Sequence, residues 1–204
     1  MAFRLTLTGV GALNSPRFAP AGLLIEYDGK HVMIDGGGDS VPTGLSLDAW
    51  LVTDDRAELM GQIRPSAKKR HLAAGIGSFS VQDLRIDPRP VIHTAHPTYG
   101  YRIVAGRHLV VWAPEFFEFP DWAEGCDLML SEAAGWDHPI HFAGNVGGHA
   151  ATLDIAKQAK LKGVRRLVFA HIGRPAIRAM DRGDRPPFGS FGYDGARFEP
   201  RRWR

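Results

Sequence analysis

The sequence contains a single cysteine and no long apolar run. Cys126 stands alone among 204 residues, which excludes an internal disulfide and a cluster of thiolate metal ligands. No stretch approaches the roughly 20 apolar residues of a membrane-spanning helix. From Phe3 onward the chain alternates apolar and polar residues, unlike a signal peptide. We therefore expect a cytoplasmic protein in a reducing compartment, without a membrane partner.

A surplus of charge of one sign is also lacking. The 25 Lys and Arg residues face 22 Asp and Glu residues, for a formal net charge of +3. Basic residues cluster only at 68–70 and in a tail that contains Arg201, Arg202 and Arg204. Binding of nucleic acid would require both groups on one face, and a short basic run is more often a solvated turn. We therefore expect a small-molecule or nucleotide-like substrate and no nucleic-acid partner.

The hydrophobic pattern predicts a mixed α/β protein. With 204 residues and 44% hydrophobic content, one domain over residues 1–204 is the simplest expectation. Segments 22–27 and 30–35 flank Asp28-Gly29 and predict a hairpin with a type I′ turn. Other strands are predicted at 3–8, 47–53, 69–73, 78–86, 91–94, 99–104 and 107–113. Later, helices at 120–125, 151–162 and 175–181 alternate with strands at 127–131 and 165–171, which indicates parallel pairing covered by helices.

Histidines and carboxylates recur just after the predicted strands. They are Asp54, Glu58, His93, His96, Glu115, Glu132 and His171. His149 follows Gly147-Gly148 and precedes a predicted helix. Strand ends meet at one rim of a sheet, so these side chains predict a site there. Taken alone, each has a structural explanation, and we interpret Glu132 as an acceptor of backbone N–H groups in its loop.

Several segments together resemble the metallo-β-lactamase superfamily, specifically its ribonuclease Z and phosphodiesterase-like branch. The segments that carry the resemblance are Leu7-Thr8-Gly9-Val10-Gly11, Val32-Met33-Ile34-Asp35-Gly36, His96-Pro97-Thr98-Tyr99-Gly100, Asp127 to Ala133, Gly148-His149 and Val168 to Ile172. The resemblance spans nearly the whole chain. It implies a four-layered αβ/βα sandwich, a fold in which homodimers are common.

The resemblance also implies a metal site. His171 matches the last ligand, Glu115 stands where the family carries a bridging Asp, and His93 and His96 compete for one ligand position. The departure is at the motif Thr-His-x-His-x-Asp-His, which aligns with residues 53–59 and retains no histidine.

Individual positions of that motif change the expected chemistry. Asp54 could still supply a ligand oxygen, and Glu58 could take the place of the motif's Asp. Leu59 has no donor atom. Arg56 would repel a metal ion, because its guanidinium is permanently cationic.

Two arrangements follow from these changes. In the first, one divalent ion (zinc, manganese or iron) is held by His93 or His96, Glu115, His171 and Asp54. His149 is then a proton donor or an oxyanion partner, Glu58 assists the attacking water, and the substrate is a phosphoric ester.

In the second arrangement, the Arg56 guanidinium occupies the metal position and pairs with Asp54, Glu58 or Glu115. The protein is then a metal-free pseudoenzyme or small-ligand binding module. In both, the short segment between Gly61 and Val91 leaves no room for the long arm of a tRNA-processing enzyme.

Overall fold

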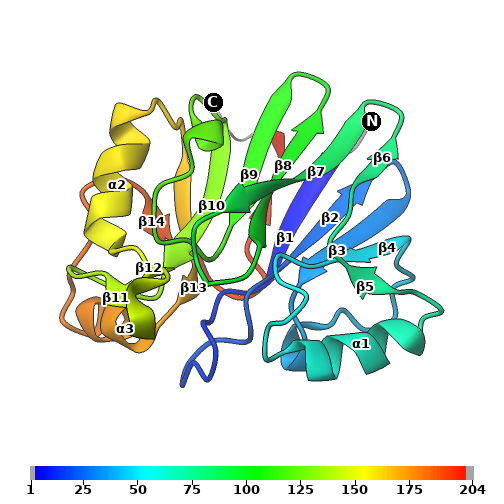
Figure 1. Ribbon diagram of the computed structural model, residues 1–204. Helices are drawn as coiled ribbons and strands as arrows, with labels where there is room; N and C mark the ends of the chain where they lie inside the picture. The colour runs from blue at the N-terminus through cyan, green and yellow to red at the C-terminus, as the bar shows by residue number, and fades with distance from the viewer. Residues whose placement is uncertain (1–2, 201–204) are drawn as a thin grey trace.

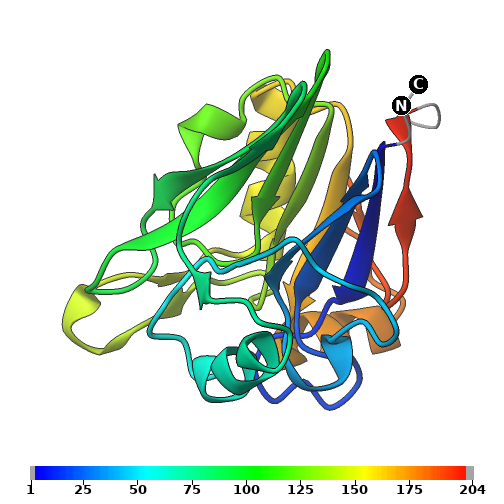
Figure 2. The same ribbon diagram turned by 90° about the vertical axis from the view of Figure 1, so that its right-hand side faces the viewer.

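Two large β-sheets face each other and enclose the main hydrophobic core (Figures 1 and 2). The computed structural model describes residues 3–200, so the arginines of the C-terminal tail lie outside the described residues. None of the helices within this range is long and apolar enough to cross a membrane.

The first sheet has the strand order β15-β1-β2-β3-β4-β5. Its strands are β1 (Phe3–Gly9), β2 (Gly22–Tyr27), β3 (Lys30–Asp35), β4 (Ala49–Leu51), β5 (Ala74–Gly75) and β15 (Arg197–Phe198). Strands β1 to β3 pair antiparallel, while β3, β4 and β5 pair parallel. Asp28 and Gly29 have φ angles of 47° and 79°, so the predicted type I′ turn between β2 and β3 is confirmed.

The second sheet has the order β14-β13-β10-β9-β8-β7-β6. Its strands are β6 (Phe79–Val81), β7 (Leu84–Val91), β8 (Thr98–Ala105), β9 (His108–Ala113), β10 (Leu128–Ala133), β13 (Leu167–Ile172) and β14 (Ser190–Phe191). A separate hairpin joins β11 (Ile140–His141) to β12 (Gly148–His149). The parallel strands β9, β10 and β13 end at the same edge of the sheet, which sets the position of the site.

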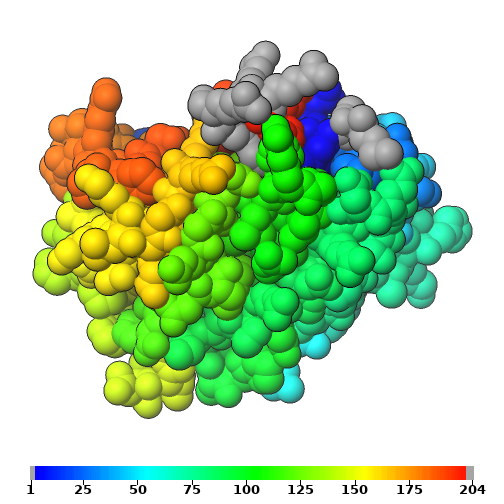
Figure 3. Space-filling model, turned by 90° about the horizontal axis from the view of Figure 1, so that it is seen from above, coloured from blue at the N-terminus to red at the C-terminus, as the bar shows by residue number. Residues whose placement is uncertain are grey.

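Helices cover the outer faces of both sheets. They are α1 (Met60–Lys68), α2 (Thr152–Leu161) and α3 (Arg174–Asp181), with single 3₁₀ turns at η1 (Gly38–Ser40), η2 (Asp121–Ala123) and η3 (Ala143–Asn145). Alternate residues of β2 serve opposite faces: Leu23 joins the core between the sheets, and Leu24 packs with Ile63 of α1. Helix α2 packs on β10 and β13, and Figure 3 shows it (yellow) beside the green strands of the second sheet.

Some predicted elements were wrong in type or length. The strand expected at 69–73 is instead the turn that closes α1, in which the Leu72 amide donates to the Ala67 carbonyl. Leu72 packs against the buried apolar residues beneath α1. Its apolar side chain therefore stabilises the end of that helix. The strand expected at 78–86 is a hairpin that turns at Gln82 (φ 53°). The helix expected at 120–125 is only one 3₁₀ turn, and the strand expected at 91–94 ends at Val91.

Candidate active site

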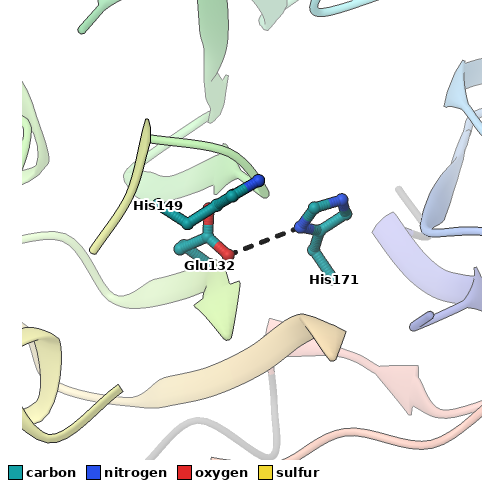
Figure 4. Close-up of side chains that lie close together, drawn as sticks. All are labelled: Glu132, His149 and His171. Atoms are coloured by element: carbon teal, nitrogen blue, oxygen red, sulfur yellow. Dashed lines mark hydrogen bonds and ion pairs between the residues drawn. The ribbon is translucent and has the colours of Figure 1, made fainter. Parts of the chain in front are cut away.

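Glu132 lies at the end of β10 and holds two histidines. It is fully buried, and its Oε2 accepts hydrogen bonds from His149 Nδ1 (2.7 Å) and the Phe116 amide (3.2 Å). Its Oε1 accepts from the Ala134 amide (2.7 Å) and His171 Nδ1 (3.4 Å). Figure 4 shows the Glu132 carboxylate between the two rings. Because a carboxylate only accepts, each Nδ1 carries a hydrogen and each Nε2 is left for another partner.

Glu115 lies across the cluster, two residues after β9. Its Oε1 is 2.9 Å from His171 Nε2 and 3.9 Å from His93 Nε2. The Nδ1 of His93 lies 2.8 Å from the carbonyl oxygen of Gly148 and therefore donates to it. The Nε2 atoms of His93 and His171 thus converge on one carboxylate.

Charge pairing dominates the protonation of this cluster. Burial by itself lowers the pKa of His171, but Glu115 and Glu132 together raise the pKa to about 10. Burial raises the pKa of Glu115, and the positive charge of His171 outweighs it and brings the pKa to about 2. The pKa of Glu132 is likewise held well below its usual range, because His149 and His171 outweigh its burial. The two carboxylates on either side of His171 therefore favour its protonated, cationic form.

The β11–β12 hairpin fixes His149 and His93 relative to each other. The Gly148 amide donates to the His93 carbonyl over 2.8 Å, and the two imidazole rings lie 4.7 Å apart. The ring of Phe142 packs edge-on against both, at 5.2 and 5.3 Å. Gly147 has a φ of 142°, and a Cβ there would lie 2.2 Å from the His93 carbonyl oxygen. Only glycine permits this close approach.

Two strand ends hold non-glycine residues in the left-handed region. His171 at the end of β13 has a φ of 56°, and Asp35 at the end of β3 has a φ of 55°. Both line the same pocket, together with Glu115 and Asp54. Such conformations are costly and occur preferentially at functional sites, which supports placing the site here.

Asp35 is a pocket residue that the sequence reasoning did not select. Its Oδ1 accepts from the amide (2.7 Å) and hydroxyl (2.9 Å) of Thr53, and its Oδ2 accepts from Trp112 Nε1 (2.7 Å). Burial raises the pKa of Asp35 to about 6, with a further contribution from the charge of Glu115, against the lowering effect of these hydrogen bonds. Its position before three glycines at a strand end was the available signal.

Three solved structures share this architecture over nearly their whole length. The metallo-β-lactamase fold protein YhfI from Bacillus subtilis matches with a TM-score of 0.74 and 18% identity, covering 98% of this chain and 100% of that one. A diphosphatase from the PhnP family matches with a TM-score of 0.73 and 17% identity, covering 98% and 97%. This chain has the metallo-β-lactamase fold. The short form of human tRNase Z also matches, with a TM-score of 0.68 and 13% identity, covering 96% and 98%.

The predicted α/β sandwich with the metallo-β-lactamase fold is therefore confirmed. No protein-family model matches the sequence, and no curated protein does. At these low identities the similarity is one of fold, and the chemistry has to be inferred from the side chains.

Asp54, in the segment that replaces the family's histidine motif, contacts only one of the two histidines that compete for a ligand position. Both carboxylate oxygens of Asp54 lie close to His96 Nε2, at 3.0 and 2.9 Å. His93 instead faces Glu115. His93 thus joins the histidine and carboxylate cluster, whereas His96 pairs with Asp54 at its edge.

Arg56 does not occupy the cluster. Its side chain is exposed, and its backbone amide donates to Asp54 over 2.8 Å. Within residues 3–200, Asp54 and Glu115 form their ion pairs with His96 and His171, and none joins Arg56. The structure therefore does not place the guanidinium in the metal position: Asp54 and Glu115 are paired with histidines, and within residues 3–200 Glu58 forms no ion pair with Arg56.

Glu58 lies at the exposed side of the pocket, next to Leu59. Its carboxylate lines the pocket. Among the described residues, it forms no hydrogen bond or ion pair with the histidines of the cluster. Its assistance to the attacking water remains a prediction.

Proposed function

We propose that this protein is a metal-dependent hydrolase with one divalent ion, acting on a phosphoric ester. The observation that carries the proposal is the convergence of His93 Nε2 and His171 Nε2 on Glu115 Oε1. Both imidazoles have their Nδ1 atoms engaged by other acceptors. Histidine ligands oriented in this way by hydrogen bonds at the second nitrogen are typical of metal sites.

The donor set fits zinc, manganese or iron. Two imidazole nitrogens and one carboxylate make three protein ligands, the usual number in a catalytic zinc site that keeps an open position. Asp54 lines the same pocket and could contribute a further oxygen by releasing His96. When bound, the ion would supply Lewis-acid chemistry toward the ester.

Glu132 fits an orienting role better than a ligand role. Glu132, His149 and His171 also lie close enough together to form a ligand group, with candidate donor atoms within 4.8 Å of one another. However, both oxygens of Glu132 already accept two N–H groups each. A metal there would displace the hydrogen bonds that hold the strand end, whereas Glu115 can exchange only its ion pairs.

His149 is the residue placed to transfer a proton. Glu132 fixes its Nδ1–H, so Nε2 is the nitrogen that can donate to or accept from a substrate oxygen. Its ring stacks 5.4 Å from that of His171, next to the proposed ligands. We propose that His149 protonates the leaving oxygen and that Glu58 assists water from the exposed side.

The phosphoric ester is inferred from similarity together with this geometry. Two of the similar structures are described as a diphosphatase and a tRNase Z. Hydrolysis of a phosphoric ester would use the proposed ion, His149 as the proton donor and the carboxylate of Glu58 at the open side.

The test is metal content combined with hydrolysis of bis(4-nitrophenyl) phosphate. We expect about one equivalent of metal per chain in protein purified without chelator, and activity that His171→Ala and His149→Ala abolish. His138→Ala is the matched control, because its side chain is 86% exposed and lies outside the cluster. Unchanged activity in both site variants would show that the site is elsewhere.

A metal-free binding module is the second candidate. It is favoured by the ion pairs of His171 with Glu115 and Glu132, which balance the charge of the cluster without an ion. A stable protein that takes up no zinc, manganese or iron would select this function.

A further inference from the structure

The pocket beside the histidine and carboxylate cluster has an apolar side. Leu13, Ala57, Leu59, Ile63 and Pro114 line it together with the polar residues described above. Leu13 is 44% exposed, so part of this hydrocarbon surface is in contact with water. Covering such a surface with a ligand is favourable.

The charged lining of the same pocket is almost entirely acidic. Asp35, Asp54, Glu58 and Glu115 supply four carboxylates, and His171 is the cationic partner of one of them. Within residues 3–200, neither lysine nor arginine lines this pocket. A bound divalent ion would attract one phosphoryl group here, but the described lining supplies no lysine or arginine for additional negative charges.

The apolar side is built on a closely packed backbone. A Cβ at Gly37 would lie 3.3 Å from Cγ1 of Ile63 and 3.9 Å from Cβ of Leu59. The glycine loop after β3 therefore supports Leu59 and Ile63 from behind. Their side chains form a preformed surface, so little ordering is needed when a ligand binds.

We propose that Leu13, Leu59 and Ile63 form a subsite for a compact, uncharged hydrocarbon group of the substrate, attached directly to the reacting phosphoryl group. The inference rests on the proposed function and specifies its substrate class as aryl or alkyl esters rather than polyanions. Leu59 aligns with a histidine of the metal motif, so the altered motif contributes hydrocarbon where a ligand would stand. The change of motif thus adds substrate selectivity.

The test compares binding of phenylphosphonate and methylphosphonate by titration calorimetry, with zinc present and at a pH where both are dianions. The two probes carry the same charge, so their ratio reports the hydrocarbon group. We expect phenylphosphonate to bind at least about tenfold more tightly. Leu13→Ser and Leu59→Ser should each reduce this ratio several-fold. The control is Leu161→Ser, on α2, where the side chain is 72% exposed and away from the pocket lining.

The outcomes separate the subsite from the hydrolase proposal. Phosphonates are not hydrolysed, so a retained preference without turnover of phenyl 4-nitrophenyl phosphate would refute hydrolysis and keep the subsite. A ratio near one, a ratio unaffected by Leu13→Ser, or no binding of either probe would overturn the subsite. Leu13 lies in an exposed loop, so its variant tests the subsite even if Leu59→Ser unfolds.

Discussion

At the scale of single residues, the site depends on carboxylates that differ in protonation although all are at least partly buried. Glu115 and Glu132 are paired with imidazoles and stay ionised, whereas Asp35 has only neutral donors as hydrogen-bond partners. A buried carboxylate without a cation is favoured in its protonated form. Neighbouring carboxyl groups in one pocket therefore carry different charges at the same pH.

The raised pKa of Asp35 predicts a loss of stability as pH rises. Its pKa is about 6 in the folded chain against 3.8 for the free group, so the folded state binds this proton more tightly. The resulting destabilisation is absent below about pH 4 and complete above about pH 6, with a magnitude of about 3 kcal/mol. Thermal unfolding of wild type and Asp35→Asn across this interval should differ in slope. Equal slopes would exclude Asp35 as the titrating group.

Glu132→Gln tests whether Glu132 orients the histidines or binds the ion. The amide puts an N–H₂ donor where a carboxylate oxygen now accepts hydrogen bonds. Because two donors then face each other, His149 and His171 lose their fixed orientation. We expect activity to fall by about 10- to 100-fold, while metal per chain stays close to that of wild type. Glu115→Gln should instead lower the metal content. The opposite pattern would make Glu132 the ligand.

At the scale of elements, the β11–β12 hairpin connects the proposed proton donor to a proposed ligand. Its strand β12 carries His149, and its backbone binds the carbonyl of His93 through Gly148. Displacement of this hairpin would therefore disturb both groups together. Proton donation by His149 and metal binding by His93 would therefore both depend on this hairpin.

Gly147→Ala should disturb the hairpin more than Gly144→Ala does. Both glycines have positive φ angles, of 142° and 78°, so both variants introduce backbone strain. Only the Cβ at Gly147 would meet the His93 carbonyl; at Gly144 the nearest atom is 3.7 Å away. We expect Gly147→Ala to lose an additional 1–3 kcal/mol or so of stability and most activity. Similar melting temperatures for the two variants would contradict this.

Elements that depend on local sequence were predictable. The turn at Asp28-Gly29 and the alternation of strands with helices after residue 127 follow from nearby residues alone. The turn at 69–73 was mispredicted because its apolar residue packs under α1, which the local pattern does not show. The same limit applies to the site: His171 and Glu115 were selected as strand ends, but the double role of Glu132 depends on histidines 17 and 39 positions away.

At the scale of the whole molecule, the proposed ion would join separate parts of the chain. Its ligands lie after β9, at the end of β13 and in the loop between β7 and β8. A ligand that binds only the folded state stabilises it according to its free concentration. Binding should therefore raise the stability of the entire fold.

Zinc should raise the melting temperature in a concentration-dependent manner. At a free concentration 100 times the dissociation constant, the gain is about 2.7 kcal/mol. His93→Ala should remove most of the shift, whereas His141→Ala, an exposed histidine of the neighbouring hairpin, should keep it. A shift of the same size in both variants would indicate binding outside the proposed cluster.

Two short strands near the end of the described chain form one edge of each large sheet. Strand β15 covers the edge of β1, and β14 covers the edge of β13. Each is only two residues long, so it leaves few free backbone groups for another molecule to extend the sheet. Without residues 190–198, the longer edges of β1 and β13 would be open to pairing between chains. We therefore expect a variant that lacks residues 190–198 to aggregate more readily at high concentration.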